Sequence, residues 1–215
     1  GLQYSDRLDI MGTGTLNIDE SRQLQLITQY YKSQGDDDYG LNLGKGFSAI
    51  RGTSTPFVSN GLNSDRIPGT ERHLISLQYS DSAFLGQELV GQVYYRDESL
   101  RFYPFPTVNA NKQVTAFSSS QQDTDQYGMK LTLNSKPMDG WQITWGLDAD
   151  HERFTSNQMF FDLAQASASG GLNNKKIYTT GRYPSYDITN LAAFLQSGYD
   201  INNLFTLNGG VRYQY

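Results

Sequence analysis

The sequence contains no cysteine, and this absence excludes several kinds of protein at once. A disulfide-stapled scaffold, a thiolate zinc site and a cysteine nucleophile all need residues that these 215 amino acids do not include. Long apolar runs are also missing, whereas a membrane-spanning helix needs roughly 20 consecutive apolar residues. We therefore expect neither a disulfide scaffold nor a helical membrane protein.

Positive charge is scarce and scattered. The 17 lysines and arginines do not cluster, and the formal net charge is −5. A nucleic-acid-binding protein ordinarily carries a basic patch that contacts phosphates. We expect no nucleic-acid partner.

Alternation of apolar and polar residues is what the chain has in abundance. Its period of two is typical of β-strands, and it recurs in eight stretches that join as four hairpins with short polar turns. The apolar series are Leu8 to Ile18, Leu24 to Tyr30, His73 to Tyr79, Leu89 to Tyr95, Tyr127 to Leu133, Trp141 to Ala149, Leu191 to Tyr199 and Phe205 to Tyr215.

Charged residues occupy the opposite phase from these apolar series. They are Asp9, Arg72, Glu88, Arg96, Lys130, Asp148, Asp150 and Arg212. A soluble β-sandwich also hides one face and hydrates the other, so alternation by itself does not separate a sandwich from a membrane barrel. Strand length, aromatic placement and loop length make that distinction.

These three features favour a membrane barrel. Several stretches approach the roughly 9 to 11 residues of a tilted membrane strand. Aromatic residues gather at both ends of the strands, as at membrane interfaces. The connections between hairpins, Gln34 to Thr70, Asp97 to Asp125 and Phe154 to Asp187, are far longer than the turns within them. We predict an all-β fold: a segment of an antiparallel up-and-down transmembrane β-barrel with long extracellular loops.

The direction of the strands predicts that this segment is interior to a larger barrel. If the short turns are periplasmic, the first strand begins and the eighth ends on the extracellular side. Both ends of a bacterial barrel normally face the periplasm. Edge strands in lipid also need partners for their backbone groups, so we expect these partners in additional polypeptide.

The chain resembles the TonB-dependent outer-membrane siderophore transporters over its whole length, and several segments carry this resemblance. They are Ser33-Gln34-Gly35-Asp36-Asp37-Asp38-Tyr39-Gly40, Arg101-Phe102-Tyr103-Pro104-Phe105-Pro106, Gly181-Arg182-Tyr183-Pro184-Ser185-Tyr186 and Gly140-Trp141-Gln142-Ile143-Thr144-Trp145-Gly146. The resemblance implies a barrel of roughly 22 strands with a plugged lumen. Residues 1–215 would then be part of the barrel, without the plug domain and the remaining strands.

The resemblance also implies a function. A ferric siderophore, aerobactin-like, would be bound and taken up with energy relayed by the TonB system. Iron would enter only as part of this ligand, with no cofactor of the protein's own. The implied location is the Gram-negative outer membrane, where lipid surrounds the barrel and bacteriocins or phages exploit the receptor.

The implied ligand, a ferric citrate–hydroxamate siderophore, is anionic. Its pocket should therefore offer cationic donors and aromatic walls at the extracellular mouth of the barrel. The loop residues of these types are Arg51, Arg66, Arg101, Phe102, Tyr103, Lys176, Tyr178, Arg182, Tyr183 and Tyr186. The alternative interpretation is that the loop cations are only hydrated and that the aromatics pack the loops on themselves. Four charged residues lie on the polar phase: Lys130, Asp148, Asp150 and Arg212. The favoured interpretation is that they are hydrated or paired inside a polar lumen, and the alternative is that they contact a plug or line the translocation route.

Two other classes compete with a transporter. Asp148, Asp150 and His151 stand where an outer-membrane protease would place an Asp and His pair that activates water. A structural histidine near the interface is favoured over this dyad, and we expect the protein not to be an enzyme. The third class is a soluble all-β adhesion or structural domain, which would dissolve without detergent.

Overall fold

The computed structural model describes residues 5–35, 69–102, 105–111, 113–168 and 175–215. They form one antiparallel sheet in the order β1-β2-β3-β4-β6-β7-β9-β10, with β5 paired to β6 and β8 paired to β7. The elements are β1 (Ser5–Asn17), β2 (Arg22–Gly35), β3 (Gly69–Phe84), β4 (Gln87–Arg101), β5 (Phe105–Val108), β6 (Val114–Met138), β7 (Trp141–Phe161), α1 (Leu163–Ala168), β8 (Lys176–Gly181), β9 (Tyr186–Asn202) and β10 (Phe205–Gln214).

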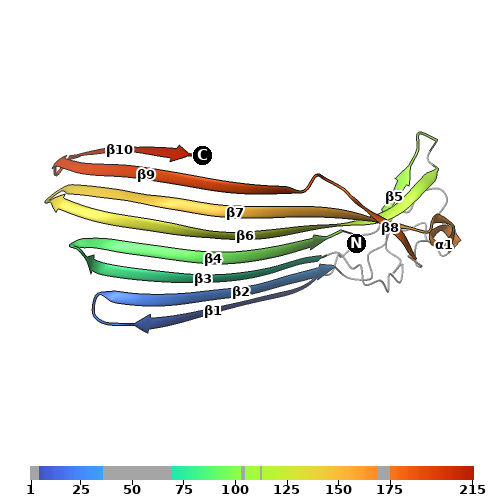
Figure 1. The fold of residues 1–215 in the computed structure, drawn as a ribbon, viewed down its shortest axis with the longest axis horizontal. Coiled ribbons are helices and arrows are strands. Elements are labelled where there is room, and N and C mark those ends of the chain that lie inside the picture. Colours follow the sequence, from blue (N-terminus) through green and yellow to red (C-terminus); the bar gives the residue numbers. More distant parts are fainter. Residues whose placement is uncertain (1–4, 36–68, 103–104, 112, 169–174) are drawn as a thin grey trace.

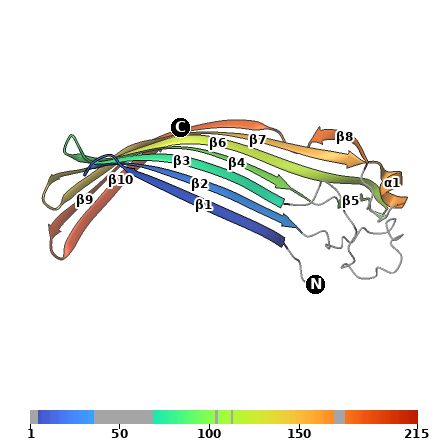
Figure 2. The same cartoon turned by 90° about the horizontal axis from the view of Figure 1, so that it is seen from below.

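The sheet is a simple meander. Figure 1 shows the eight long strands side by side in chain order, with the short turns at one end and β5, α1 and β8 at the other. Figure 2 shows that the sheet is strongly curved. The four predicted hairpins are confirmed. No helix of the described chain is both long enough and apolar enough to cross a membrane.

The structure differs from the sequence prediction at the end away from the short turns. β4 extends to Arg101 and β6 begins at Val114, so most of the predicted loop 97–125 is paired strand. β7 likewise extends to Phe161, and β5 and β8 were not predicted. The reason is that strand pairing needs only backbone partners, and these segments pair without the strict apolar–polar alternation from which the eight stretches were predicted. Most of the first predicted long loop, residues 36–68, lies outside the described residues.

The register separates an apolar face from a polar face. Leu77 pairs with Leu26 and Val93, whereas the next residue, Gln78, pairs with Gln25 and Gln92. Leu77 is 39% exposed and many other large apolar side chains are also exposed. The apolar face therefore has no second layer over it within the described part of the chain, unlike the inner face of a soluble sandwich.

Aromatic and charged residues mark where the apolar band ends. Tyr95 pairs with Tyr127 toward one end of the band, and Trp141 pairs with Tyr199 toward the other. Just beyond the first pair, one cross-strand row contains His73, Asp97, Asp125, Arg153 and Asp187. His73 Nδ1 lies 2.9 Å from Asp97 Oδ2, and Arg153 Nε donates to Asp187 Oδ1 at 3.0 Å. This sequence of apolar band, aromatic belt and polar rim is that of a membrane barrel.

The short turns are closed by local hydrogen bonds. In the β1–β2 turn the Asp19 carboxylate accepts from the backbone N–H of Ser21 at 2.9 Å and of Arg22 at 2.8 Å, and it also pairs with the Arg22 guanidinium. These donors, the guanidinium first, hold the pKa of Asp19 well below its usual range. Gly140 supplies the positive φ of 75° that the β6–β7 turn requires.

Two glycines on the polar face allow aromatic rings to lie against the sheet. A Cβ at Gly128 would meet the Tyr94 ring at 2.7 Å. A Cβ at Gly146 would lie 2.6 Å from the Phe194 ring and 2.2 Å from the backbone oxygen of Leu131. Because backbone within a sheet cannot easily move, Gly146 has no room for a side chain.

We expect Gly146→Ala to destabilise the full-length protein in lipid by about 1–3 kcal/mol, since the added methyl group overpacks a closed site. Urea unfolding measured from both directions tests this expectation. Gly91→Ala is the matched control, because a Cβ there meets only Leu131 Cδ1 at an ordinary 3.8 Å. Equal stability of the two variants would contradict the close packing.

Candidate functional site

The end of the sheet away from the short turns carries a small folded cap, formed by β5, α1, β8 and the adjoining ends of β6 and β7. Its core is built from Phe117, Phe161 and Ala166, with Val114, Met159 and Leu163 packed against them. Phe117 is 0% exposed and Phe161 is 2% exposed. This local hydrophobic core holds β5, α1, β8 and the adjoining ends of β6 and β7 together.

Arg182 lies beside the cap, among three aromatic rings. Its guanidinium carbon is 5.6 Å from the ring centre of Phe102, 5.8 Å from that of Phe105 and 5.2 Å from that of Tyr183. These distances are those of cation–π contacts. Arg182 Nη1 also donates to Ser120 Oγ. We refer to Arg182, Phe102, Phe105, Tyr183 and Ser120 as the Arg182 cluster.

Backbone pairing brings these residues together from distant parts of the chain. Phe102 N donates to the carbonyl of Ser120 at 2.9 Å, and Ser119 Oγ donates to the carbonyl of Phe102 at 3.0 Å. Arg182 follows directly after β8, and its N–H donates to the carbonyl of Ser156 on β7 at 3.0 Å. The backbone of β6 holds Phe102, in the connection after β4, and the backbone of β7 holds Arg182, in the connection after β8. The two connections are thereby brought together.

The structure unites part of the predicted site and separates the rest. Phe102, Arg182 and Tyr183 meet in the Arg182 cluster. Tyr186 stands apart: its ring stacks on Phe154 at 5.0 Å, and its hydroxyl donates to Glu152 Oε1 at 3.0 Å.

Other predicted residues lie further away or on another face. Arg101 pairs in register with Gly69 and Gln121, on the face opposite to Phe102, and its Nη2 is 3.7 Å from Glu71 Oε2. Tyr178 stacks on Phe160 at 4.8 Å, and Lys176 is exposed at the start of β8. Arg51, Arg66 and Tyr103 lie outside the described residues.

The sequence prediction missed two members of the Arg182 cluster. Phe105 lies in the same aromatic segment as Phe102, so its residue type was a usable signal. Ser120 belongs to the run Ser118–Ser120, where nothing in the sequence distinguishes it. Ser118 and Ser120 are both fully buried, which only the structure reveals.

The predicted Asp and His pair of a protease does not assemble. His151 pairs in register with Tyr127 on the apolar face, and the two ring centres lie 5.1 Å apart with the rings tilted by 32°. Asp148 and Asp150 lie on the polar face, where Asp148 accepts from Arg212 at 2.8 Å and Asp150 from Asn190 at 2.9 Å. Neither carboxylate can orient His151 from the other side of the sheet. Within the described ranges, no three His, Asp or Glu side chains are grouped to hold a metal ion.

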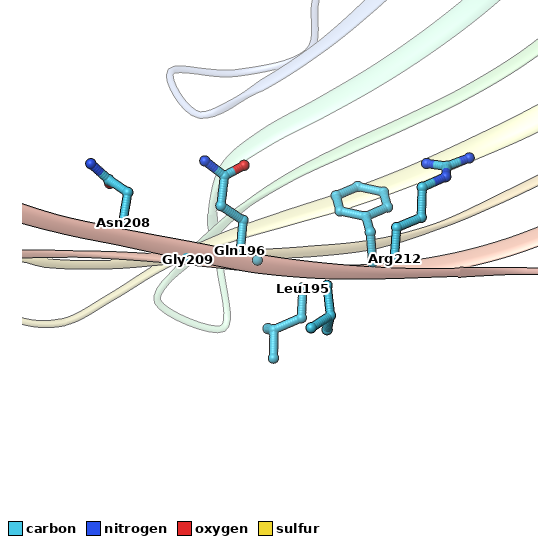
Figure 3. A pocket seen from close by; sticks show the side chains of 8 residues that line it. Leu195, Gln196, Asn208, Gly209 and Arg212 are labelled. Carbon is cyan, nitrogen blue, oxygen red and sulfur yellow. The ribbon is translucent and has the colours of Figure 1, made fainter.

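A pocket around β9 and β10 is not a ligand site. Figure 3 shows Gln196, Asn208 and Arg212 on one side of the ribbon and Leu195 on the other. The pocket therefore includes residues of both faces and wraps around strand β10. The same view shows the remaining strands curving toward the side of the polar residues, so the polar face is the concave one.

A family model described as TonB dependent receptor-like, beta-barrel matches residues 11–215. The chain belongs to this family. It is a family of receptors and not of enzymes, which agrees with the separation of His151 from Asp148 and Asp150. The prediction of a TonB-dependent receptor barrel is confirmed.

Two curated receptors are similar along the whole chain. The chain is 99% identical over 215 residues to the ferric aerobactin receptor of Escherichia coli, covering 100% of the chain and 29% of that protein. It is 40% identical over 212 residues to the rhizobactin receptor of Rhizobium meliloti (strain 1021), covering 99% of the chain and 28% of that protein. The chain thus spans less than a third of the length of these relatives.

Solved structures with low sequence identity have the same fold. The copper transporter OprC superposes with a TM-score of 0.65 at 15% identity, over 99% of this chain and 28% of that chain. The unliganded ferric citrate transporter FecA gives a TM-score of 0.61 at 15% identity, over 99% and 29%.

We expect Phe117→Ala to open the cap. Truncation of a fully buried phenylalanine costs about 3–5 kcal/mol, and here the loss falls on a local unit instead of the whole sheet. Hydrogen exchange of the full-length protein should therefore accelerate in residues 105–118 while β2, β3 and β4 stay protected. Ile177→Ala is the control, since Ile177 is 59% exposed in the same cap. Unchanged protection in the Phe117 variant would contradict the assigned core.

Proposed function

We propose that the protein containing this chain is an outer-membrane receptor that binds a ferric siderophore, ferric aerobactin, and takes it up with energy from the TonB system. The observation that carries this proposal is the identity of 99% to the ferric aerobactin receptor along the whole chain. The similarity to a rhizobactin receptor supports the same class of ligand. Iron enters only as part of the ligand.

The chemistry of the Arg182 cluster supports an anionic ligand. A guanidinium has five N–H donors, and among the described residues the Arg182 side chain donates to one acceptor, Ser120 Oγ. The rings of Phe102, Phe105 and Tyr183 lie around the guanidinium. Hydrogen bonds between a guanidinium and a carboxylate are charge-assisted and therefore stronger than those between neutral groups. The cluster therefore offers an oriented cation with aromatic walls.

The remaining predicted contact residues belong to the same proposal, and we expect them to contribute unequally to binding of the ligand. Tyr186 lies on the concave face near the cluster's end of the sheet, and Lys176 and Tyr178 lie on β8. Arg51, Arg66 and Tyr103 stay predictions from the sequence. Arg101 faces the opposite side of the sheet, so we expect it to contribute least.

The proposed location is the outer membrane, with the apolar face in lipid and the cap outside the cell. Residues 1–215 would form part of the barrel, and the plug domain and the contact with TonB would come from other parts of the protein. Use of the receptor by bacteriocins or phages also stays a prediction.

In the full-length receptor, Arg182→Gln should weaken binding of ferric aerobactin at least about tenfold, because one charge-assisted hydrogen bond is worth roughly 1.5–3 kcal/mol. Arg101→Gln is the matched control and should change affinity less than about twofold. The measurement is equilibrium binding of the radiolabelled ferric complex to cells. Equal losses in both variants, or none in the first, would remove Arg182 from the binding wall.

The membrane placement is tested by two adjacent residues. Leu77→Arg would put a charge into lipid beside Leu26 and Val93, and such a change costs about 2–4 kcal/mol at the midplane. Gln78→Arg puts the same charge on the concave face. We expect a strong fall in the amount of folded receptor in outer-membrane fractions for the first variant only. Equal amounts of the two would contradict the assignment of the faces.

A further inference from the structure

On the concave face, cations lie at successive positions along β6. At the end of β6 near the cap, Arg182 contacts Ser120. Six residues further along β6, Gln126 pairs with Arg96 of β4, and four residues beyond that Lys130 pairs with Gln92 and Asp148. At about 3.3 Å per residue, Arg96 lies roughly 20 Å from the Arg182 cluster along the strand.

Arg96 differs from the arginines near it. Arg72 pairs with Glu98 at 2.7 Å and Arg212 pairs with Asp148 at 2.8 Å. The Nε of Arg96 is buried and finds no hydrogen-bond partner among the residues that the structure describes, and its cross-strand neighbours are Leu74 and Gln126. A buried donor left unsatisfied is costly. The position therefore lacks an acceptor that the described part of the chain does not supply.

An aromatic ring lies beside this cation. Tyr94 is two residues from Arg96 on the same face, and its ring covers Gly128. Asp150 lies in the same cross-strand row as Tyr94, opposite Gly128, and Glu152 lies in the same row as Arg96, opposite Gln126. An anion at Arg96 would thus be attracted by one cation and repelled by nearby carboxylates.

We propose that Arg96, with Tyr94 beside it, is a second and transient binding point for the anionic ferric ligand inside the barrel, after the ligand leaves the Arg182 cluster. This inference rests on the proposed function. Passage through a pore requires sites that are favourable enough to enter and weak enough to leave. A single half-buried guanidinium, with the carboxylate of Glu152 one strand further along the same row, meets both conditions.

The test compares Arg96→Gln, Arg96→Lys and Arg153→Gln in the full-length receptor. Arg153 is the matched control because it pairs with Asp125, the residue next to Gln126, but faces away from the concave side. Binding of ferric aerobactin is measured on cells without TonB function, and the initial uptake rate per receptor on energised cells. The thermal midpoint is measured on purified receptor.

We expect Arg96→Gln to leave binding within about twofold of wild type and to lower the uptake rate about fivefold to tenfold, with recovery in Arg96→Lys and no change in Arg153→Gln. Unchanged uptake, or binding lost in parallel with uptake, would overturn the inference. A fall in the thermal midpoint of Arg96→Gln would overturn it too, because Arg96 would then pair permanently with a carboxylate of the rest of the protein. Failure of the proposed function is distinct, since the wild-type receptor itself would then not bind ferric aerobactin.

Discussion

The hydrogen bonding of the backbone in hydrocarbon is the constraint on which the rest of this structure depends. Lipid offers no partner for a peptide N–H or C=O, so each strand must satisfy its groups on its neighbours. The unbroken ladder from β1 to β10 does this for the interior strands, with each long strand paired to the next long strand of the chain. The ladder fixes the register, and the register puts Leu77 on the apolar face and Gln78 on the concave face.

How far the sequence predicts the fold follows from the same constraint. Where one face meets lipid, the alternation is strict, and the four hairpins were predicted correctly. Beyond the apolar band neither face of a strand has to be apolar along its whole length, so the segment Ser118–Gln126 has no alternation to read, although it is paired strand. β5 and β8 were missed for this reason, and so was the extension of β7 to Phe161.

The candidate site was predictable by residue type but not by arrangement. Arg182 and Phe102 were both identified from their chemistry, yet their contact depends on two connections meeting on β6 and β7. Arg101 and Phe102 are adjacent in sequence and lie on opposite faces, a difference that only the register of β4 reveals. Ser120 holds Arg182 but has nothing in its sequence context to mark it.

The assignment of the apolar face to lipid is the central claim, and spin labels in the full-length receptor test it most directly. Labels placed one at a time at residues 73–80 of β3 should alternate in collision with oxygen, which concentrates in lipid, and with a water-soluble nickel chelate. We predict high oxygen accessibility at residues 75, 77 and 79 and low values at 74, 76 and 78. Uniform accessibility, or the opposite phase, would contradict the account.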